Sequence, residues 1–158
     1  MAGTDVGSEP TSGTQTALGV DMKLEVVTLP VSDVDRSKSF YESLGWRLDI
    51  DLVVSDDLRT VQFTPPHSGC SIQLGKGGTT AEPGSAQGMI LVVSDIDGAR
   101  EDLISRGVEV SEVQEARPPG FDSQERSYCA RASFSDPDGN RWVLQEITTR
   151  LPGREWEE

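Results

Sequence analysis

One carboxylate stands out among the residues of this sequence that could do chemistry. Glu146 ends the segment SFSDPDGNRWVLQE, in which turn-forming residues lead into an apolar strand. Trp142, Leu144 and Glu146 share one face of that strand, because side chains alternate with a period of two. A carboxylate in line with Trp and Leu could be a metal ligand or a general acid or base. It could equally be a solvated strand end, or pair with an arginine such as Arg131 or Arg141.

The chain has few other candidate groups. His67 is its only histidine and follows two prolines in a predicted turn, so we interpret it as a surface residue and not as a metal ligand. Cys70 and Cys129 lack the spacing of a zinc site and are expected to be reduced thiols. The run DPDGN lacks the length and the closing Glu of a calcium loop, so it is predicted to be a hairpin turn.

Composition narrows the class of protein. The 158 residues predict one domain, and 14 basic against 27 acidic residues give a formal net charge of -13. Without a basic cluster, binding to nucleic acid or to an anionic membrane is not expected. The longest apolar run, residues 89–93, is too short to span a bilayer, and the N-terminus lacks the apolar core of a signal peptide. We therefore expect a cytoplasmic protein with a small-molecule ligand, and the acidity permits a cationic one.

Two halves of the chain repeat one pattern. VSDVDRSKSFYESLG at 31–45 recurs as VSDIDGAREDLISRG at 93–107. An internal repeat of this kind predicts two copies of one structural unit. We predict repeat units at 22–78 and 86–148, a disordered tail at 1–21 and a C-terminal tail at 149–158.

Each unit is predicted to contain a strand, a helix and three more strands. An Asp or Ser before each helix can cap it, and a Gly can end it. The expected strands are 24–31, 46–54, 59–64, 70–74, 89–93, 108–113, 128–135 and 141–147, and the expected helices are 34–44 and 94–106. Two tandem βαβββ units favour an α+β fold with a curved, half-barrel mixed sheet, helices on the outside and a concave face left for a ligand.

These residues resemble a known family. The paired βαβββ repeat, the opening LPVSDVDRSKSFYESLG and the closing FSDPDGNRWVLQE are similar to the vicinal oxygen chelate superfamily, which includes glyoxalase I, bleomycin-resistance proteins and extradiol dioxygenases. The resemblance covers about residues 23–148. It implies the βαβββ fold, and it implies the chemistry much less, because one scaffold hosts many functions.

The resemblance also implies where a divalent metal would bind. The family holds its metal with residues on the first and last strands of each unit, and the aligned positions here are Val26, Leu74, Gly88 and Glu146. Only one of these four can bind a metal, whereas a metal site needs three or more protein donors. We therefore expect no metal cofactor, although a divalent ion recruited by other ligands stays open.

Aromatic residues are expected mainly in the core. Phe40, Tyr41, Trp46, Phe63, Phe134 and Trp142 have the spacing of core residues. Among them, Trp142 is the best candidate for stacking on a ligand, because it shares a face with Glu146. Phe121 and Tyr128 flank a Pro/Gly-rich loop at 116–130 and could form a lid.

Two functions remain open. The first is a metal-free protein of the bleomycin-resistance type that binds a cationic or aromatic molecule; its ligand-binding residues would be Val26, Leu74, Gly88, Trp142, Phe121 and Tyr128. The second is a small lyase or isomerase in which Glu146 is the catalytic base or the sole remaining metal ligand. Both predict a homodimer, as the resemblance implies, and light scattering that gave the mass of one chain would contradict it.

Overall fold

The computed structural model describes residues 20–117, 119–120 and 125–151. Residues 24–149 form one compact unit, and the fold and the sites lie within it. The predicted tail at 1–21 falls outside the described residues except for its last two, and the predicted C-terminal tail falls outside them from residue 152 on. The described residues contain no helix that is long and apolar enough to cross a membrane.

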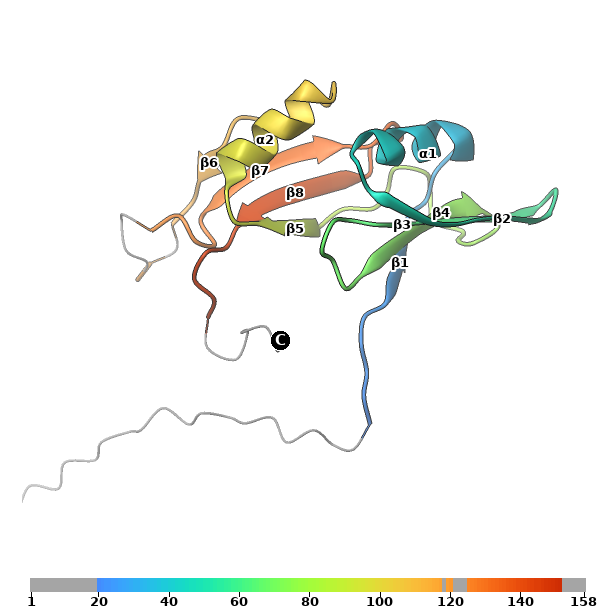
Figure 1. The fold of residues 1–158 in the computed structure, drawn as a ribbon, viewed down its shortest axis with the longest axis horizontal. Coiled ribbons are helices and arrows are strands. Elements are labelled where there is room, and N and C mark those ends of the chain that lie inside the picture. Colours follow the sequence, from blue (N-terminus) through green and yellow to red (C-terminus); the bar gives the residue numbers. More distant parts are fainter. Residues whose placement is uncertain (1–19, 118, 121–124, 152–158) are drawn as a thin grey trace, which may run out of the picture. The chain divides into compact units, whose positions relative to one another are not determined.

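Each half of the unit forms a four-stranded mixed sheet (Figure 1). In the first half the strand order is β1-β4-β3-β2, with β1 parallel to β4. In the second it is β5-β8-β7-β6, with β5 parallel to β8. The elements are β1 (Val26–Thr28), α1 (Val34–Ser43), β2 (Arg47–Ser55), β3 (Leu58–Thr64), β4 (Ser71–Lys76), β5 (Met89–Val93), α2 (Ile96–Ser105), β6 (Gln114–Glu115), β7 (Ala130–Ser135) and β8 (Arg141–Glu146). The predicted α+β fold of two βαβββ units is confirmed, and its sheets are open.

The repeated sequence pattern encodes the helix ends. Asp33 caps α1 by accepting a hydrogen bond from the Arg36 amide, and Asp95 caps α2 in the same way. Gly45 and Gly107 follow the two helices with φ of 78° and 86°, a left-handed conformation that side chains disfavour. The shared VSD-x-D and closing Gly thus specify the same capped helix twice.

One predicted strand, 108–113, is wrong. The strand in this part of the chain is the short β6, which begins only at Gln114. Ser111 explains the delay: its amide donates to the Ser133 carbonyl, but the Ser133 amide donates to the Ser111 hydroxyl instead of a carbonyl. A side chain that takes the place of a backbone acceptor interrupts the ladder.

Both helices lie on the same side of the two sheets (Figure 1). One apolar core fills the space beneath them and contains residues of both halves. The predicted core aromatics Tyr41, Trp46, Phe63, Phe134 and Trp142 are buried, and Phe40 is half-buried against them. The face of each sheet turned away from the helices is called the open face below.

A buried polar junction joins the halves. The Asp136 carboxylate accepts hydrogen bonds from the Tyr41 hydroxyl at 3.0 Å and from the Asn140 amide at 2.8 Å. Asn140 also donates to the Pro30 carbonyl, and the Trp142 indole N–H donates to the Tyr41 hydroxyl. Burial and the nearby Asp136 carboxylate raise the pKa of Tyr41 far above its usual range. The tyrosine is therefore held as a neutral hydrogen-bonding link between α1 and β8.

A second carboxylate of the DPDGN turn extends the junction. Asp138 accepts hydrogen bonds from the Ser32 amide, from Arg36 and from the Ser37 hydroxyl. Burial disfavours its ionised form, but the Ser32 contacts and the Arg36 charge outweigh burial and lower the pKa of Asp138. The predicted hairpin turn thus also fastens the second half to the start of α1.

Candidate ligand-binding site

The strand alternation in β8 decides which side chains reach the open face. Trp142, Leu144 and Glu146 are buried on the face that packs against the helices. Val143 and Gln145 lie on the opposite face. Their ladder partners on β5 are Ile90 and Val92, which are 50% and 43% exposed. The open face of the second sheet therefore has an apolar strip along β5 and β8.

The open face of the first sheet is polar and internally paired. Gln73 donates to Gln62 at 3.1 Å, and the Thr64 and Ser71 hydroxyls lie 2.7 Å apart. Asp49, which sits at a register shift in β2, accepts a hydrogen bond from Thr64. The hydrogen bonds from Thr64 and Arg47 lower the pKa of Asp49. These polar side chains satisfy one another and would present a preformed polar wall to a ligand.

An apolar groove of about 340 Å³ runs between β1 and β5. A volume of this order suits a small organic ligand, and apolar walls with a few polar groups are typical of such sites. The residues that line it are Leu24, Val27, Pro65, Ser68, Cys70, Ser71, Ile72, Gly88, Met89, Ile90, Leu91 and Trp142. The groove uses both halves of the chain, and Ile90 connects it to the open face of the second sheet.

The structure brings some of the predicted site residues to this groove. Gly88 and Trp142 line it, and Val26 lies on β1 beside Val27, which also lines it. Leu74 does not reach it: only 1% exposed, it is part of the core. Tyr128 lies in a turn before β7 with φ of 64°, and Phe121 lies outside the described residues.

Trp142 is mainly a core residue. Its side chain is 4% exposed, and its ring stacks on Phe134 with an interplanar angle of 12°. The indole N–H is satisfied by Tyr41. Since the ring packs against Trp46 and Phe134, stacking of a ligand on its face stays a prediction without support from these contacts.

Glu146 lies on the helix side of the sheet. The residue is 8% exposed, and its carboxylate accepts a hydrogen bond of 3.0 Å from the amide of Ile96, the first residue of α2. A negative charge at a helix N-terminus is stabilising. The carboxylate of Glu146 thus supports α2, and its role as a catalytic base remains an untested prediction.

Replacing Glu146 with Gln should lower the free energy of unfolding by about 1 kcal/mol, because the helix N-terminus loses a charged acceptor. Ligand binding at the groove should not change. Urea denaturation followed by tryptophan fluorescence would measure the stability, with Glu101→Gln on the exposed face of α2 as the control. A variant of full stability that lost binding or turnover would contradict the structural role and favour the catalytic one.

The residues at the family's metal positions do not fit a divalent ion. Val26, Leu74 and Gly88 offer no side-chain donor. Within the described ranges, no group of three His, Cys, Asp or Glu side chains is placed to hold a metal. His67 lies in the turn after β3 with φ of 60°. We derive no reaction step through a metal from these residues.

Sequence reasoning missed the residues that do occupy the open face beside these positions. They are Gln73 on β4 and Val143 and Gln145 on β8, as the ladder pairings show. The signal was present: because Trp142 and Leu144 are core residues, the period of two assigns Glu146 to the core face and Val143 to the open face. The same period of two assigns Leu74 to the core face, because it follows buried Ile72 by two residues.

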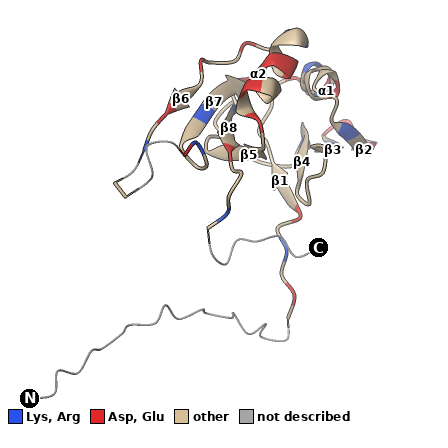
Figure 2. Ribbon diagram, turned by 60° about the vertical axis from the view of Figure 1, so that its left-hand side comes forward, with Lys and Arg blue, Asp and Glu red and all other residues tan. Residues whose placement is uncertain are grey.

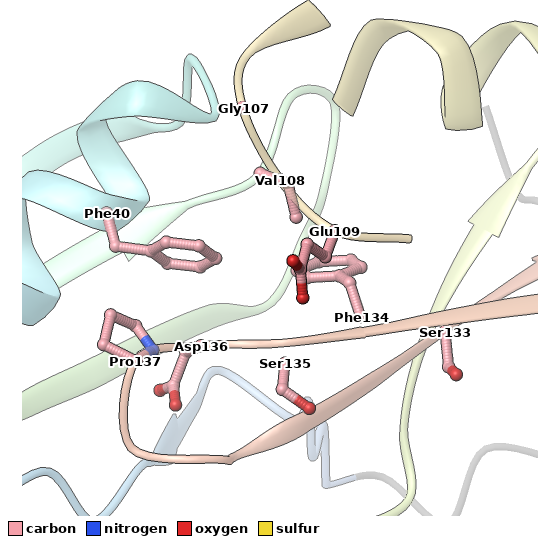
Figure 3. A pocket seen from close by; sticks show the side chains of 9 residues that line it. All are labelled: Phe40, Gly107, Val108, Glu109, Ser133, Phe134, Ser135, Asp136 and Pro137. Atoms are coloured by element: carbon pink, nitrogen blue, oxygen red, sulfur yellow. The ribbon is translucent and has the colours of Figure 1, made fainter. Parts of the chain in front are cut away.

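Another hollow lies on the helix side of the second sheet. About 420 Å³ in volume, it is bordered by Phe40 of α1, by Phe134 and Asp136, and by Val108 and Glu109 after α2 (Figure 3). Its buried carboxylate, Asp136, is engaged with Tyr41 and Asn140. We therefore assign this hollow to the junction of the halves and not to the ligand site.

Comparisons with known proteins agree with this architecture. The family model described as Glyoxalase/Bleomycin resistance protein/Dioxygenase superfamily matches residues 23–144. No curated protein matches the chain. Among solved structures, TnmS3, an antibiotic binding protein from Streptomyces sp. CB03234, is 30% identical with a TM-score of 0.66; the match covers 81% of this chain and 98% of TnmS3.

Two further solved structures are similar. A glyoxalase/bleomycin resistance protein from the same Streptomyces is 31% identical with a TM-score of 0.61, over 78% of this chain and 99% of its own. A superfamily member from Sphaerobacter thermophilus DSM 20745 is 29% identical with a TM-score of 0.61, over 80% and 98%. The chain belongs to the glyoxalase/bleomycin resistance protein/dioxygenase superfamily.

Proposed function

We propose that this protein binds an apolar or amphipathic small molecule in the groove between β1 and β5, without the metal chemistry of its family. The observation that carries the proposal is the groove itself, which is apolar, of ligand size and built from both halves. The similarity to TnmS3, an antibiotic binding protein, supports the same conclusion.

The residues at the metal positions favour binding over metal-assisted catalysis. Val26 and Gly88 lie at or beside the groove and supply no donor. A Cβ built on Gly88 would meet no atom within 4 Å, so there is open space next to this residue. Glu146 caps the start of α2 and is not among the residues that line the groove. An apolar wall with free volume thus stands beside the positions where the family binds a metal.

A homodimer is part of this proposal. The strand β2 carries a run of exposed apolar side chains at Ile50, Leu52, Val53 and Val54. Exposed apolar surface of this kind is typical of protein interfaces. A second chain that covered β2 would hide these side chains from water.

A neutral fluorescent probe, N-phenyl-1-naphthylamine, tests the groove. We expect saturable binding in buffer that contains EDTA, because the groove needs no metal. Val27→Trp should fill the groove and weaken binding about ten-fold, which equals 1.4 kcal/mol. Ile104→Trp, which adds the same ring at an exposed position on α2, is the matched control.

The same titration distinguishes the outcomes. Ile90→Asn gives a second test that does not depend on how well a tryptophan is accommodated, since Ile90 is half exposed and lines the groove. Equal affinity of the wild type and both groove variants would place binding elsewhere and refute the proposed site. Binding that appears only after a divalent metal is added would restore the metal-dependent function.

A further inference from the structure

We infer that the ligand is an organic anion whose acidic group is bound by Arg131 and Arg141 on the open face of the second sheet. The inference rests on the proposed function, because it names the chemical class of the ligand. That class is an apolar body with a carboxylate, sulfonate or phosphate group.

The two arginines flank one hollow. Arg131 of β7 and Arg141 of β8 line a space of about 260 Å³. Its other lining residues include Ser133 of β7, Val143 of β8 and Gln114 of β6. Ser133 and Val143 are ladder partners and lie between the two arginines along the strands. Val143 is in turn the ladder partner of Ile90, which lines the apolar groove. The hollow therefore lies on the open face of the second sheet, next to the groove.

Neither arginine has a partner within the described part of the chain. In that part, most other cations lie within 4.0 Å of a carboxylate; these are Arg36, Lys38, Arg47, Arg59, Lys76, Arg100, Arg106, Arg117 and Arg126. Among the described residues, no hydrogen bond or ion pair involves the side chain of Arg131 or Arg141. In a chain with a net charge of -13, two cations without a partner on one face are unusual.

The local charge of this face is opposite to the net charge. Figure 2 shows a basic segment on β7. The strands β5 and β7 contain no acidic residue, and Glu146, the acid of β8, points to the helix side. Glu115 of β6 pairs with Arg117. A ligand on this face therefore meets positive charge and should be anionic. The net charge of the whole chain, taken alone, would instead permit a cationic ligand.

The spacing of the arginines favours an organic anion over a small inorganic one. Arg131 pairs with Gln145, four residues along β8 from Arg141, which corresponds to about 13 Å. A ligand held between them lies across Val143 and beside the exposed Ile90 and Val92. Guanidinium groups bind acidic oxygens through two parallel hydrogen bonds, and the apolar strip accepts the rest of the molecule.

Two probes with one apolar body test the inference. 8-Anilinonaphthalene-1-sulfonate carries a sulfonate, and N-phenyl-1-naphthylamine has the same rings without it. We expect the wild type to bind the sulfonate about ten-fold more tightly, since charge-assisted hydrogen bonds contribute at least 1.4 kcal/mol. The double variant Arg131→Gln/Arg141→Gln should lose this preference and keep its affinity for the neutral probe. Lys76→Gln/Arg106→Gln, which removes two charges from cations paired with Asp57 and Asp102, is the control.

The outcomes separate the inference from the proposed function. If both probes bind equally, or if the preference survives in the double variant, the arginines do not select the ligand, although the groove still binds. If Lys76→Gln/Arg106→Gln removes the preference as well, the effect is one of net charge and the assigned site is wrong. If neither probe binds, the proposed function itself fails.

Discussion

Replacing Asp136 with Ala is expected to lower the free energy of unfolding by about 3 to 4 kcal/mol, because two buried side-chain donors lose their acceptor. These donors are the Tyr41 hydroxyl and the Asn140 amide. The other carboxylate oxygen of Asp136 also accepts from the backbone amides of Asp138 and Asn140, so the turn itself would lose two bonds. Urea denaturation followed by tryptophan fluorescence would measure the change.

Two further variants make this result specific to the junction. Tyr41→Phe removes only one of the donors and should cost about 1 to 2 kcal/mol. Asp56→Ala changes an exposed carboxylate in the β2–β3 turn and should leave stability within about 0.5 kcal/mol of the wild type. A loss below about 1 kcal/mol for Asp136→Ala would show that the two halves do not depend on this carboxylate.

A second large effect is expected at Gly75, where the backbones of β3 and β4 come close together. A Cβ at this position would lie 1.9 Å from the Arg59 carbonyl oxygen, whereas real Cβ contacts essentially never fall below 3.0 Å. Gly75→Ala must therefore displace β3 from β4, and we expect a loss of about 3 kcal/mol or more. Since β4 also pairs with β1, the wall of the groove should move as well.

Gly69→Ala is the matched control for this prediction. A Cβ at Gly69 meets no atom within 4 Å, and the residue precedes the same strand. We expect the free energy of unfolding to rise by less than about 1 kcal/mol, because alanine restricts the unfolded chain. Thermal unfolding of both variants would give the comparison, and equal stability of the two would refute the steric argument.

The two predictions bear on function because the junction and the groove share Trp142. Its indole N–H donates to Tyr41, whose hydroxyl donates to Asp136, and Trp142 also lines the groove. Loss of the Asp136 carboxylate should therefore weaken binding of the neutral probe along with stability. The Glu146→Gln change, at a residue that does not line the groove, should not.

Much of the fold could be predicted from the sequence because its signals are local. The caps at Asp33 and Asp95 and the terminating Gly45 and Gly107 need only the residues of one helical turn. The repeat then gives the second half once the first is assigned. The prediction of a strand at 108–113 was wrong for a long-range reason. It depended on how Ser111 would hydrogen-bond to Ser133 in β7.

The candidate site was less predictable because it depends on which face of each strand the helices cover. Periodicity groups Trp142, Leu144 and Glu146 together, and that grouping is confirmed by their burial. The alignment with the family's metal positions pointed Glu146 and Leu74 toward the ligand, whereas the packing of the helices encloses both. Burial of a whole strand face is a property of the assembled layers and not of one segment.

The sequence by itself determined the family, the two βαβββ units, the capped helices and the apolar residues at three of the four metal positions. The tertiary structure decided three other features: the junction at Asp136, the groove between β1 and β5, and the absence of a partner for Arg131 and Arg141 among the described residues. The physical reason is distance along the chain. Helix caps and strand alternation act between near neighbours, but hydrogen bonds such as Tyr41 to Asp136 join residues far apart in sequence, and only the packed fold brings them together.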